Sequence, residues 1–577
     1  MKQLTGLDAS FLYMETPTTF GHVNGLSIYQ RPSDDFDAFD LVYRRFEGMI
    51  GRLEPMRRRL VQVPLSLDHP YWIDDPDFDL DYHVRHIGLA PPGAADQLAE
   101  QVARIVARPM DRSHPLWECY VIEGLADGRW AMLTKTHHST IDGASGVILL
   151  NMLTDTDPDA SNTLEPVAWS GEPIPSDNEL LRLTAANLAS NPLKSLRLQL
   201  RLVRDIASAA GLTSVSGLAS QARSAITSIA TGGGSDDSSP RISLPITPAP
   251  PTPWSKSITS HRRFAMRSTS LDNIKALKDA TGCTVNDIVM AICAGALREY
   301  LIKHDALPDK PLRAMVPVSI RTGDEEDPWT NRVSSIIAEL PTNCDDPLER
   351  VARCHAAMDA AKRQMDLVPA TALTDITQFT SPVVATSAMR LISRLKLADR
   401  VNMPANVTIS NVPGPRQPLY FAGAQLDNYI PVSTIADGMG LNITVHSYMN
   451  KLDFGLIACR ELVPDLWDMV DMHIAEIARL FEATGAEWVE PQQGPSMRRG
   501  GNSVTAIPRR VATAPPAAEK PATKKPAVKK ATPKKAAPRK TAAKKTAAKK
   551  TAAPKKTAAK KAPARKRTAA RLVAATA

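Results

Sequence analysis

The sequence predicts a layered α/β protein (α+β layered) with two folded regions, a linker between them and a disordered basic C-terminal tail. Strand-like and helix-like patterns alternate over residues 1–165 and again over residues 257–490, as in layered α/β domains. Residues 166–256 lose this alternation and include a stretch rich in Gly, Ser, Asp and Pro. Residues 491–577 contain mainly Ala, Pro, Lys and Thr, so few of their side chains can be buried.

The first region has three segments with strand patterns and two with helix patterns. Apolar or alternating runs predict the strands, and an amphipathic repeat after a Pro-Pro-Gly turn predicts the first helix. The predicted strands are 25–30, 120–123 and 130–136, and the predicted helices are 96–107 and 143–153. The last strand and the last helix matter most, because two adjacent histidines lie between them.

The linker contains a second amphipathic pattern. Its basic residues recur at helical spacing beside a broad aliphatic side; they are Lys194, Arg197, Arg201 and Arg204. A helix here either packs on a domain with solvated arginines or lies on an anionic lipid surface, and both interpretations stay open. The glycines, serines and prolines that follow predict a flexible connection.

The second region repeats the alternation of strands and helices. The predicted strands are 261–268, 312–320, 333–340, 406–410, 441–447 and 452–458, and the predicted helices are 270–280, 284–304 and 464–484. Thr284 and Asp287 have the spacing of a capping box, so we expect Asp287 to cap the helix that begins there. Residues 411–415, Asn-Val-Pro-Gly-Pro, predict a turn that shapes a cleft.

Charge divides the chain into two unlike parts. The whole chain has 70 Lys and Arg, 61 Asp and Glu and a net charge of +9. Residues 511–577 hold 21 of the basic residues and one acidic residue, Glu519, which leaves 49 basic and 60 acidic residues before them. The tail either only solvates the protein or contacts nucleic acid or anionic lipid non-specifically, since it has no aromatic residue to stack on bases.

The cysteines and the apolar runs indicate a cytoplasmic protein. The six cysteines are scattered without a CxxC pair or a Cys/His cluster at metal spacing, as is typical of reduced thiols. The N-terminal segment lacks the apolar stretch of a signal peptide, and no run of about 18 apolar residues predicts a spanning helix. We therefore expect any membrane contact to be peripheral.

The segment His137-His138-Ser139-Thr140-Ile141-Asp142-Gly143 is the main candidate for chemistry. The two histidines could be packing or capping residues, or metal ligands with Asp142, although no third ligand stands nearby in the sequence. A third interpretation is general-base catalysis, because neutral imidazole can take a proton from an alcohol that attacks a carbonyl. In that case Asp142 holds the turn, and Gly143 supplies a conformation or close approach that a Cβ would block.

This segment resembles the H-H-x-x-x-D-G signature of the CoA-dependent acyltransferase superfamily, which includes chloramphenicol acetyltransferase-like enzymes and condensation domains. The rest of the chain resembles the bacterial wax ester synthase/acyl-CoA:diacylglycerol acyltransferases, especially the actinobacterial triacylglycerol synthases. The resemblance rests on LTGLDASFLYMETPTTFGHV, DPDFDLDYHVRHIGLAPPG, MDRSHPLWECYVIEG, TVNDIVMAICAGALREYL, MVPVSIR, NVTISNVPGPRQPLYFAGA and GLNITVHSYMNKLDFGLIACRELVPD. It covers about residues 1–490, apart from part of the linker.

The resemblance implies two chloramphenicol-acetyltransferase-like domains with an active site in the cleft at their interface. It implies that His138 is the base, that His137 supports it, and that no covalent acyl-enzyme forms. Asn286 and Asp287 correspond to an Asn-Asp motif of the family, so both are candidate substrate-binding residues, and Asn286 is expected at the substrate or the oxyanion. Many relatives have Met before the histidine that corresponds to His22, where this chain has Phe20-Gly21; the change is expected to affect the acyl pocket.

The implied reaction moves a long-chain acyl group from acyl-CoA to diacylglycerol, or to a long-chain alcohol to form a wax ester. It needs no metal or redox cofactor, since acyl-CoA is a co-substrate. The enzyme would work in the cytoplasm, peripherally on the inner face of the plasma membrane or on lipid droplets. Two alternatives are a polyanion-binding adaptor of the nucleoid or of lipid droplets with a vestigial acyltransferase body, and a carrier-protein-dependent condensation-type transferase.

Overall fold

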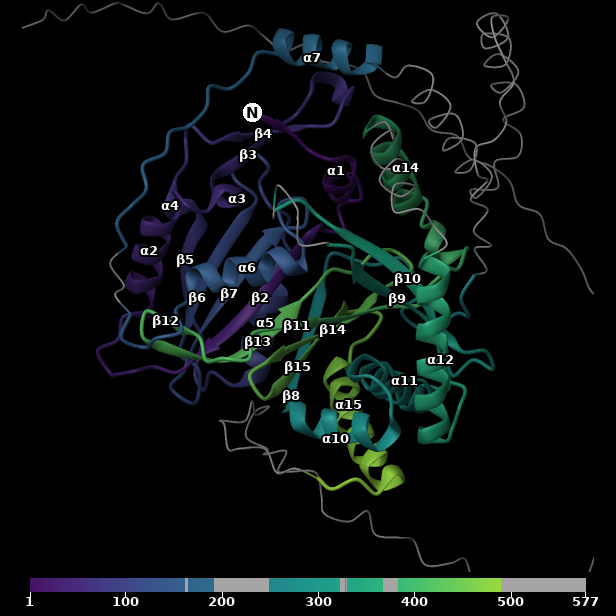
Figure 1. The fold of residues 1–577 in the computed structure, drawn as a ribbon. Helices are drawn as coiled ribbons and strands as arrows, with labels where there is room; N and C mark the ends of the chain where they lie inside the picture. The colour runs from purple at the N-terminus through teal and green to yellow at the C-terminus, as the bar shows by residue number, and fades with distance from the viewer. Residues whose placement is uncertain (161–163, 191–247, 322–326, 328, 367–381, 489–577) are drawn as a thin grey trace, which may run out of the picture. The chain divides into compact units, whose positions relative to one another are not determined.

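A computed structural model describes residues 1–160, 164–190, 248–321, 327, 329–366 and 382–488. The linker helix expected near 191–207, the glycine-rich stretch after it and the basic tail lie outside the described residues. The described residues contain two six-stranded sheets, a three-stranded sheet and the helices that cover them (Figure 1). The predicted layered α/β class is therefore confirmed.

The first sheet carries the histidine pair at the end of a central strand. Its order is β12-β13-β2-β7-β6-β5. The strands are β2 (His22–Tyr29), β5 (Val84–Gly88), β6 (Trp117–Glu123), β7 (Trp130–His137), β12 (Tyr420–Phe421) and β13 (Ala424–Val432). One face packs on α2 (Ala38–Met49) and α6 (Gly143–Leu153), and the other on α5 (Ala95–Val106). Side chains on both faces of β7 are therefore buried, which anchors the strand that ends at the histidines.

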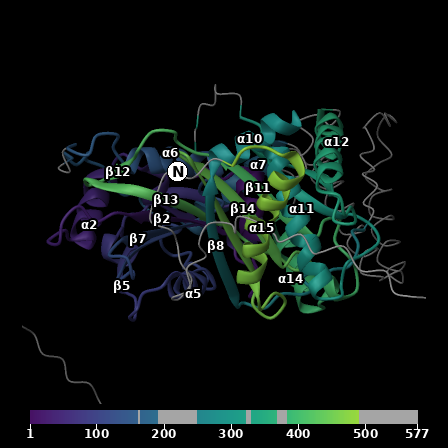
Figure 2. The same cartoon turned by 90° about the horizontal axis from the view of Figure 1, so that it is seen from below.

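The second sheet has the order β10-β9-β11-β14-β15-β8. Its strands are β8 (Arg262–Ser270), β9 (Leu312–Ser319), β10 (Val333–Leu340), β11 (Val407–Pro413), β14 (Leu441–Tyr448) and β15 (Lys451–Cys459). Figure 2 shows its helices gathered on one side: α10 (Leu271–Thr281), α11 (Val285–Lys303), α12 (Pro347–Asp366) and α15 (Leu466–Thr484). The expected caps are confirmed, since Ser270 caps α10 and Thr284 caps α11.

One hairpin joins the two halves of the chain. Strands β12 and β13 come late in the sequence, yet β13 pairs antiparallel with β2 of the first sheet. The described residues all belong to one compact unit, Met1–Arg509. The boundaries 1–165, 166–256, 257–490 and 491–577 stay a prediction from the sequence.

Further elements that the sequence patterns did not predict complete the fold. They are β1 (Lys2–Gln3), α1 (Gly6–Tyr13), α3 (Glu54–Arg57), β3 (Arg58–Val61), η1 (Pro64–Ser66), β4 (Tyr71–Asp74), α4 (Leu80–His83), α7 (Asp177–Ser190), α14 (Pro382–Arg394) and η2 (Leu397–Asp399). Thr5 caps α1 by accepting a hydrogen bond from the Asp8 backbone. This helix matters for the site because it lies against the turn after β7.

Among the described helices, none is by itself long and apolar enough to cross a membrane. Only α10 and α11 taken together pass that test, and they meet at a bend of 99°.

Candidate active site

The histidine pair lies at a strand-to-helix turn, as predicted. His137 ends β7, and α6 begins at Gly143. Asp142 is the N-cap of α6 and accepts a hydrogen bond of 2.8 Å from the Ser145 N–H. The His138 N–H donates to the Gly21 carbonyl at 2.7 Å, which ties the turn to the segment that enters β2. Local capping and sheet pairing therefore hold the backbone on both sides of His138.

His138 is the accessible histidine of the pair. Its ring is half-buried and stacks on Phe11 of α1, with 4.0 Å between centroids and 7° between planes. Its Nδ1 lies 3.0 Å from Asn331 Oδ1. Burial lowers the pKa of the imidazole, and hydrogen bonds to its own backbone and to Asn331, together with the charge of Asp142, oppose this only in part. His138 is therefore neutral at pH 7 and able to accept a proton.

His137 is buried and held in place. Its Nδ1 lies 2.7 Å from Ser139 Oγ and accepts the Ser139 N–H at 3.1 Å, so its proton is on Nε2. That Nε2 lies 3.3 Å from Glu15 Oε1. Burial acts to raise the pKa of Glu15, but His137, Arg112 and the Gly21 N–H together hold it well below its usual range. The ring leaves no room at Gly21, where a Cβ would lie 2.7 Å from Nε2.

Asp142 connects the turn to the second sheet. Its Oδ2 accepts hydrogen bonds from Arg321 Nη2 at 2.9 Å and from the Arg332 N–H at 3.0 Å. Arg321 follows β9, and Arg332 precedes β10. Burial acts to raise the pKa of Asp142, but the hydrogen bonds from Ser145 and Arg332 and the charge of Arg321 lower it. The ionised carboxylate therefore caps α6 and joins the two halves of the chain.

Gly143 does not have the close approach expected of it. A Cβ there would meet only Val412 Cγ2, at 3.9 Å, which is an ordinary contact, and the residue does not have a positive φ. The expectation that a Cβ would be blocked is therefore wrong. Gly143 is instead exposed at the start of α6, so a side chain would project into the space beside Val412.

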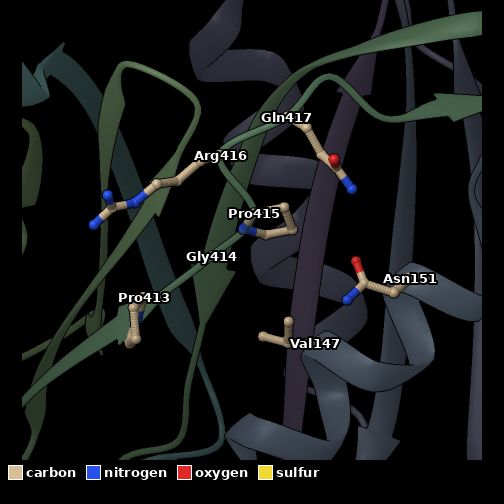
Figure 3. Close-up of a pocket in the computed structure, with 7 residues that line it drawn as sticks. All are labelled: Val147, Asn151, Pro413, Gly414, Pro415, Arg416 and Gln417. Atoms are coloured by element: carbon tan, nitrogen blue, oxygen red, sulfur yellow. The ribbon is translucent and has the colours of Figure 1, made fainter. Parts of the chain in front are cut away.

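A cavity of about 510 Å³ lies between α6 and the turn after β11 (Figure 3). It is lined by Val147, Asn151, Pro413, Gly414, Pro415, Arg416 and Gln417. Residues 143, 147 and 151 are one helical turn apart, so they share the side of α6 that faces β11 and its turn. Gly414 is required here, because a Cβ would lie 2.3 Å from the Ser447 carbonyl. The turn predicted at 411–415 begins three residues later than expected, at Gly414, because β11 continues to Pro413.

Family models match both halves of the chain. The wax ester synthase/diacylglycerol acyltransferase catalytic domain matches residues 4–289, and the WS/DGAT C-terminal domain matches residues 329–480. A probable diacylglycerol O-acyltransferase, tgs2, of Mycobacterium tuberculosis H37Rv is 35% identical over 490 residues, 83% of this chain and 98% of the relative. The chain belongs to the wax ester synthase/diacylglycerol acyltransferase family. The predicted family membership is thus confirmed, and the chain is an O-acyltransferase.

Two further members of the family, one of them a solved structure, are also similar to this chain along most of its length. The O-acyltransferase WSD of Acinetobacter baylyi is 32% identical over 493 residues, 84% of this chain and 98% of that protein. The solved wax ester synthase/diacylglycerol acyltransferase of Marinobacter aquaeolei VT8 is 30% identical, with a TM-score of 0.57, and the match covers 84% of this chain and all of that one. The two-domain acyltransferase fold implied by the resemblance is therefore confirmed.

Asn286 and Asp287 lie at the start of α11, in the helical layer of the second sheet. Asp287 forms the predicted capping box, since its Oδ2 accepts the Thr284 N–H at 3.0 Å. His355 Nδ1 of α12 lies 2.8 Å from the same oxygen. Within the described residues, no hydrogen bond joins Asn286 or Asp287 to the histidine turn, so the substrate role expected for them stays a prediction.

Cys283, Asp287 and His355 form a group that the sequence did not reveal. Their ligand atoms lie within 4.8 Å of one another, close enough to share a metal ion. His355 comes from another helix, so sequence spacing could not show the grouping. In the structure the Asp287 carboxylate is already occupied by the capping box and by His355. These contacts account for Asp287 and His355 as a helix start and an ion pair, and Cys283 Sγ lies 3.7 Å from the Thr281 carbonyl oxygen.

Five residues around the histidines were not predicted from the sequence: Asp8, Phe11, Glu15, Arg321 and Asn331. Only Asp8 had a local signal, because Thr5 and Asp8 have capping-box spacing. The others reach the turn through pairing of distant segments. Asn331, for example, is 193 residues from His138 in the sequence.

Proposed function

We propose that the chain transfers a long-chain acyl group from acyl-CoA to diacylglycerol or a long-chain alcohol, with His138 as the general base. His138 takes the proton of the acceptor hydroxyl as its oxygen attacks the thioester carbonyl. The carbon–sulfur bond then breaks, and the proton passes to the departing thiolate, so the products are an oxygen ester and CoA. The observation that carries the proposal is the half-buried His138, held at an anchored turn by its contacts with Asn331 and Phe11, where burial lowers its pKa.

The surroundings of His138 support this role. Within the described residues, no side chain hydrogen-bonds to its Nε2, which leaves that nitrogen for the acceptor hydroxyl. His137 is engaged by Ser139 and Glu15, so it supports the turn. Exposed Gly143 and the cavity lined by Val147 and Asn151 lie along α6, the helix that follows His138, and we propose that they form a passage toward the base. We propose that this passage admits substrate, and that a side chain at Gly143 would narrow it.

The donor and acceptor classes are proposed from family membership together with this chemistry. The Mycobacterium tuberculosis relative is named for diacylglycerol, and the Marinobacter protein for both wax esters and diacylglycerol. We propose that no metal or redox cofactor takes part, because exchange of a thioester for an oxygen ester requires only proton transfer. Asn286 is proposed at the substrate or the oxyanion by its position in the family motif.

The deciding experiment is product analysis with palmitoyl-CoA offered together with diacylglycerol and hexadecanol. We expect triacylglycerol, the wax ester or both, with one CoA thiol released for each ester. The ratio of the two esters reports the preferred acceptor. Thiol release without either ester, or no reaction with either acceptor, would remove the proposed function.

The pH dependence follows from the lowered pKa of His138. A general base works in its neutral form, so activity is lost as the pH falls through the pKa of the folded enzyme. Because burial holds that pKa below 6.5, we expect kcat/KM to be level at neutral pH and to fall only below about pH 6.5. Rates measured between pH 4.5 and 8 check this, and a midpoint above 7 would contradict it.

We also propose that the enzyme works in the cytoplasm, bound peripherally to the inner face of the plasma membrane or to lipid droplets, and that residues 511–577 strengthen this association. Their 21 basic residues attract anionic surfaces at close range. Deleting them is expected to leave kcat on detergent-dispersed substrate unchanged and to reduce co-sedimentation with anionic vesicles. Zwitterionic vesicles and duplex DNA are the comparison surfaces. Loss of activity in detergent would contradict the proposal.

A further inference from the structure

Asn331 reaches the catalytic turn from the other half of the chain. It lies between β9 and β10, and only 2% of its surface is exposed. Its Oδ1 lies 3.0 Å from His138 Nδ1. Its Nδ2 lies 2.7 Å from the His138 carbonyl oxygen and 2.7 Å from Asp8 Oδ1. A single buried amide therefore holds both the ring and the backbone of His138.

The neighbours of Asn331 determine which way its amide points. The amide NH₂ has two donors and the amide oxygen has none, so the nitrogen must face acceptors. The Asp8 carboxylate and the His138 carbonyl are both acceptors, and both lie at Nδ2. The opposite orientation would place the amide oxygen against these two oxygens. Asn331 Oδ1 therefore faces His138 Nδ1, which must carry the ring proton.

Asp8 holds this orientation from α1. Its Oδ1 accepts both the Asn331 N–H, at 3.1 Å, and Nδ2. Its Oδ2 accepts the Thr5 hydroxyl at 2.7 Å, within the cap of α1. Burial raises the pKa of Asp8, whereas these hydrogen bonds favour its charged form. The same helix supplies Phe11, which stacks on the His138 ring, so α1 sets both the plane of the ring and the amide that orients it.

We propose that Asn331, held by Asp8, is a positioning residue that keeps the proton of His138 on Nδ1 and so leaves Nε2 as the base. The inference rests on the proposed function, because it assumes that His138 accepts the proton of the acceptor hydroxyl. During transfer Nε2 binds that proton, and the Nδ1–H of the resulting imidazolium stays bonded to Asn331 Oδ1. The proton then leaves from Nε2 to the CoA thiolate.

The arrangement links catalysis to the docking of the two halves. Asn331 belongs to the connection between two strands of the second sheet, whereas His138 and Asp8 belong to the first half of the chain. Docking of this connection against the turn therefore adds Asn331 Oδ1 as an acceptor for the Nδ1 proton, beside the backbone of His138 itself. His137 has the opposite proton arrangement, since its Nδ1 accepts from Ser139. Adjacent histidines thus differ in tautomer because their partners differ.

The test compares Asn331→Leu, which keeps the branched shape of the side chain and removes its hydrogen bonds, with the wild-type enzyme. We expect kcat to fall roughly 10- to 100-fold while KM for acyl-CoA changes less than about threefold, as is usual when the orientation of a histidine is lost. The control is Asn343→Ala, an exposed asparagine at the other end of β10 that donates only to the Asp309 carbonyl within the described residues. It should match the wild-type enzyme.

The pH profile separates positioning from a merely structural role. The hydrogen bond to Asn331 favours the charged imidazolium of His138. Asn331→Leu should therefore move the acid limb of the pH profile, the range in which kcat/KM falls with falling pH, to lower pH. Asp8→Asn keeps the volume and removes a negative charge, so it should shift the limb in the same direction by a smaller amount. The titratable and charged groups around His138 that stay in place in both variants are the His137 imidazole, the Asp142 and Glu15 carboxylates and the Arg321 guanidinium.

The outcomes distinguish this inference from the proposed function. If Asn331→Leu fails to fold, as judged by circular dichroism and thermal melting, the pH profile of kcat/KM for Asp8→Asn tests the inference instead. A kcat and an acid limb equal to wild type in the folded variants would overturn the inference, while a loss of activity in His138→Ala would leave the proposed function standing. If His138→Ala were active, both would fall.

Discussion

Replacing His138 with alanine is expected to lower kcat for acyl transfer by roughly 10²- to 10⁴-fold, the usual contribution of a general base. The loss should fall on kcat rather than on KM, because His138 contacts the reacting hydroxyl and not the remote parts of either substrate. The ring is half-buried and its main packing contact is Phe11, so the fold should survive. Release of CoA thiol at saturating palmitoyl-CoA measures the effect.

The control for this variant is His261→Ala. His261 is exposed at the start of the second half and pairs with Glu461, at 2.7 Å. A surface ion pair of this kind contributes little to stability, so kcat and melting temperature should match the wild-type enzyme. Near-normal activity in a folded His138→Ala protein would show that another group accepts the proton.

Replacing Asp142 with alanine is expected to give the largest loss of stability. The side chain is 5% exposed and pairs with Arg321, which is 14% exposed. Removing the carboxylate leaves a largely buried guanidinium without its partner, at a cost of roughly 3 kcal/mol. Loss of the cap on α6 adds about 1 kcal/mol. The melting temperature and the urea midpoint should both fall, and kcat should fall as well because the turn that carries His138 loosens.

Asp142→Asn separates these two contributions. Its amide oxygen can still cap α6 through Ser145, but its NH₂ group would face the donors of Arg321 and Arg332. We therefore expect an intermediate loss of stability. Asp37→Ala is the matched control, since Asp37 is an exposed N-cap of α2 that forms no ion pair with any described residue, and its loss should cost only about 1 kcal/mol. Equal melting temperatures for Asp142→Ala and Asp37→Ala would contradict the role of the Arg321 contact.

Local features of the site were predictable because neighbouring residues determine them. The strand before His137 and the helix after Asp142 follow from hydrophobic pattern and capping within about 25 residues. The same holds for the caps at Ser270 and Thr284, and for the capping role of Asp287. Each of these depends on hydrogen bonds between groups a few residues apart, which the order of residues by itself specifies.

The prediction for Gly143 was wrong, because crowding at a glycine depends on segments that are distant in the sequence. Gly143 was expected to avoid a steric clash, yet a Cβ there would meet only Val412, at an ordinary distance. The crowded glycine is Gly21, over the ring of His137. Which glycine is crowded depends on the strand that pairs beside it, since β2 brings Gly21 to the end of β7, and no local pattern contains that information.

The sequence by itself determined the layered α/β class, the strand–turn–helix that carries His138, and, through its likeness to a family in both halves, the acyltransferase function. Only the tertiary structure decided that β13 joins the first sheet and that Asp8, Asn331 and Arg321 meet at the turn. Periodicity specifies which side of a strand or helix is buried, but not which distant segment buries it. That choice is made by the packing of the whole chain, and it is what orients His138.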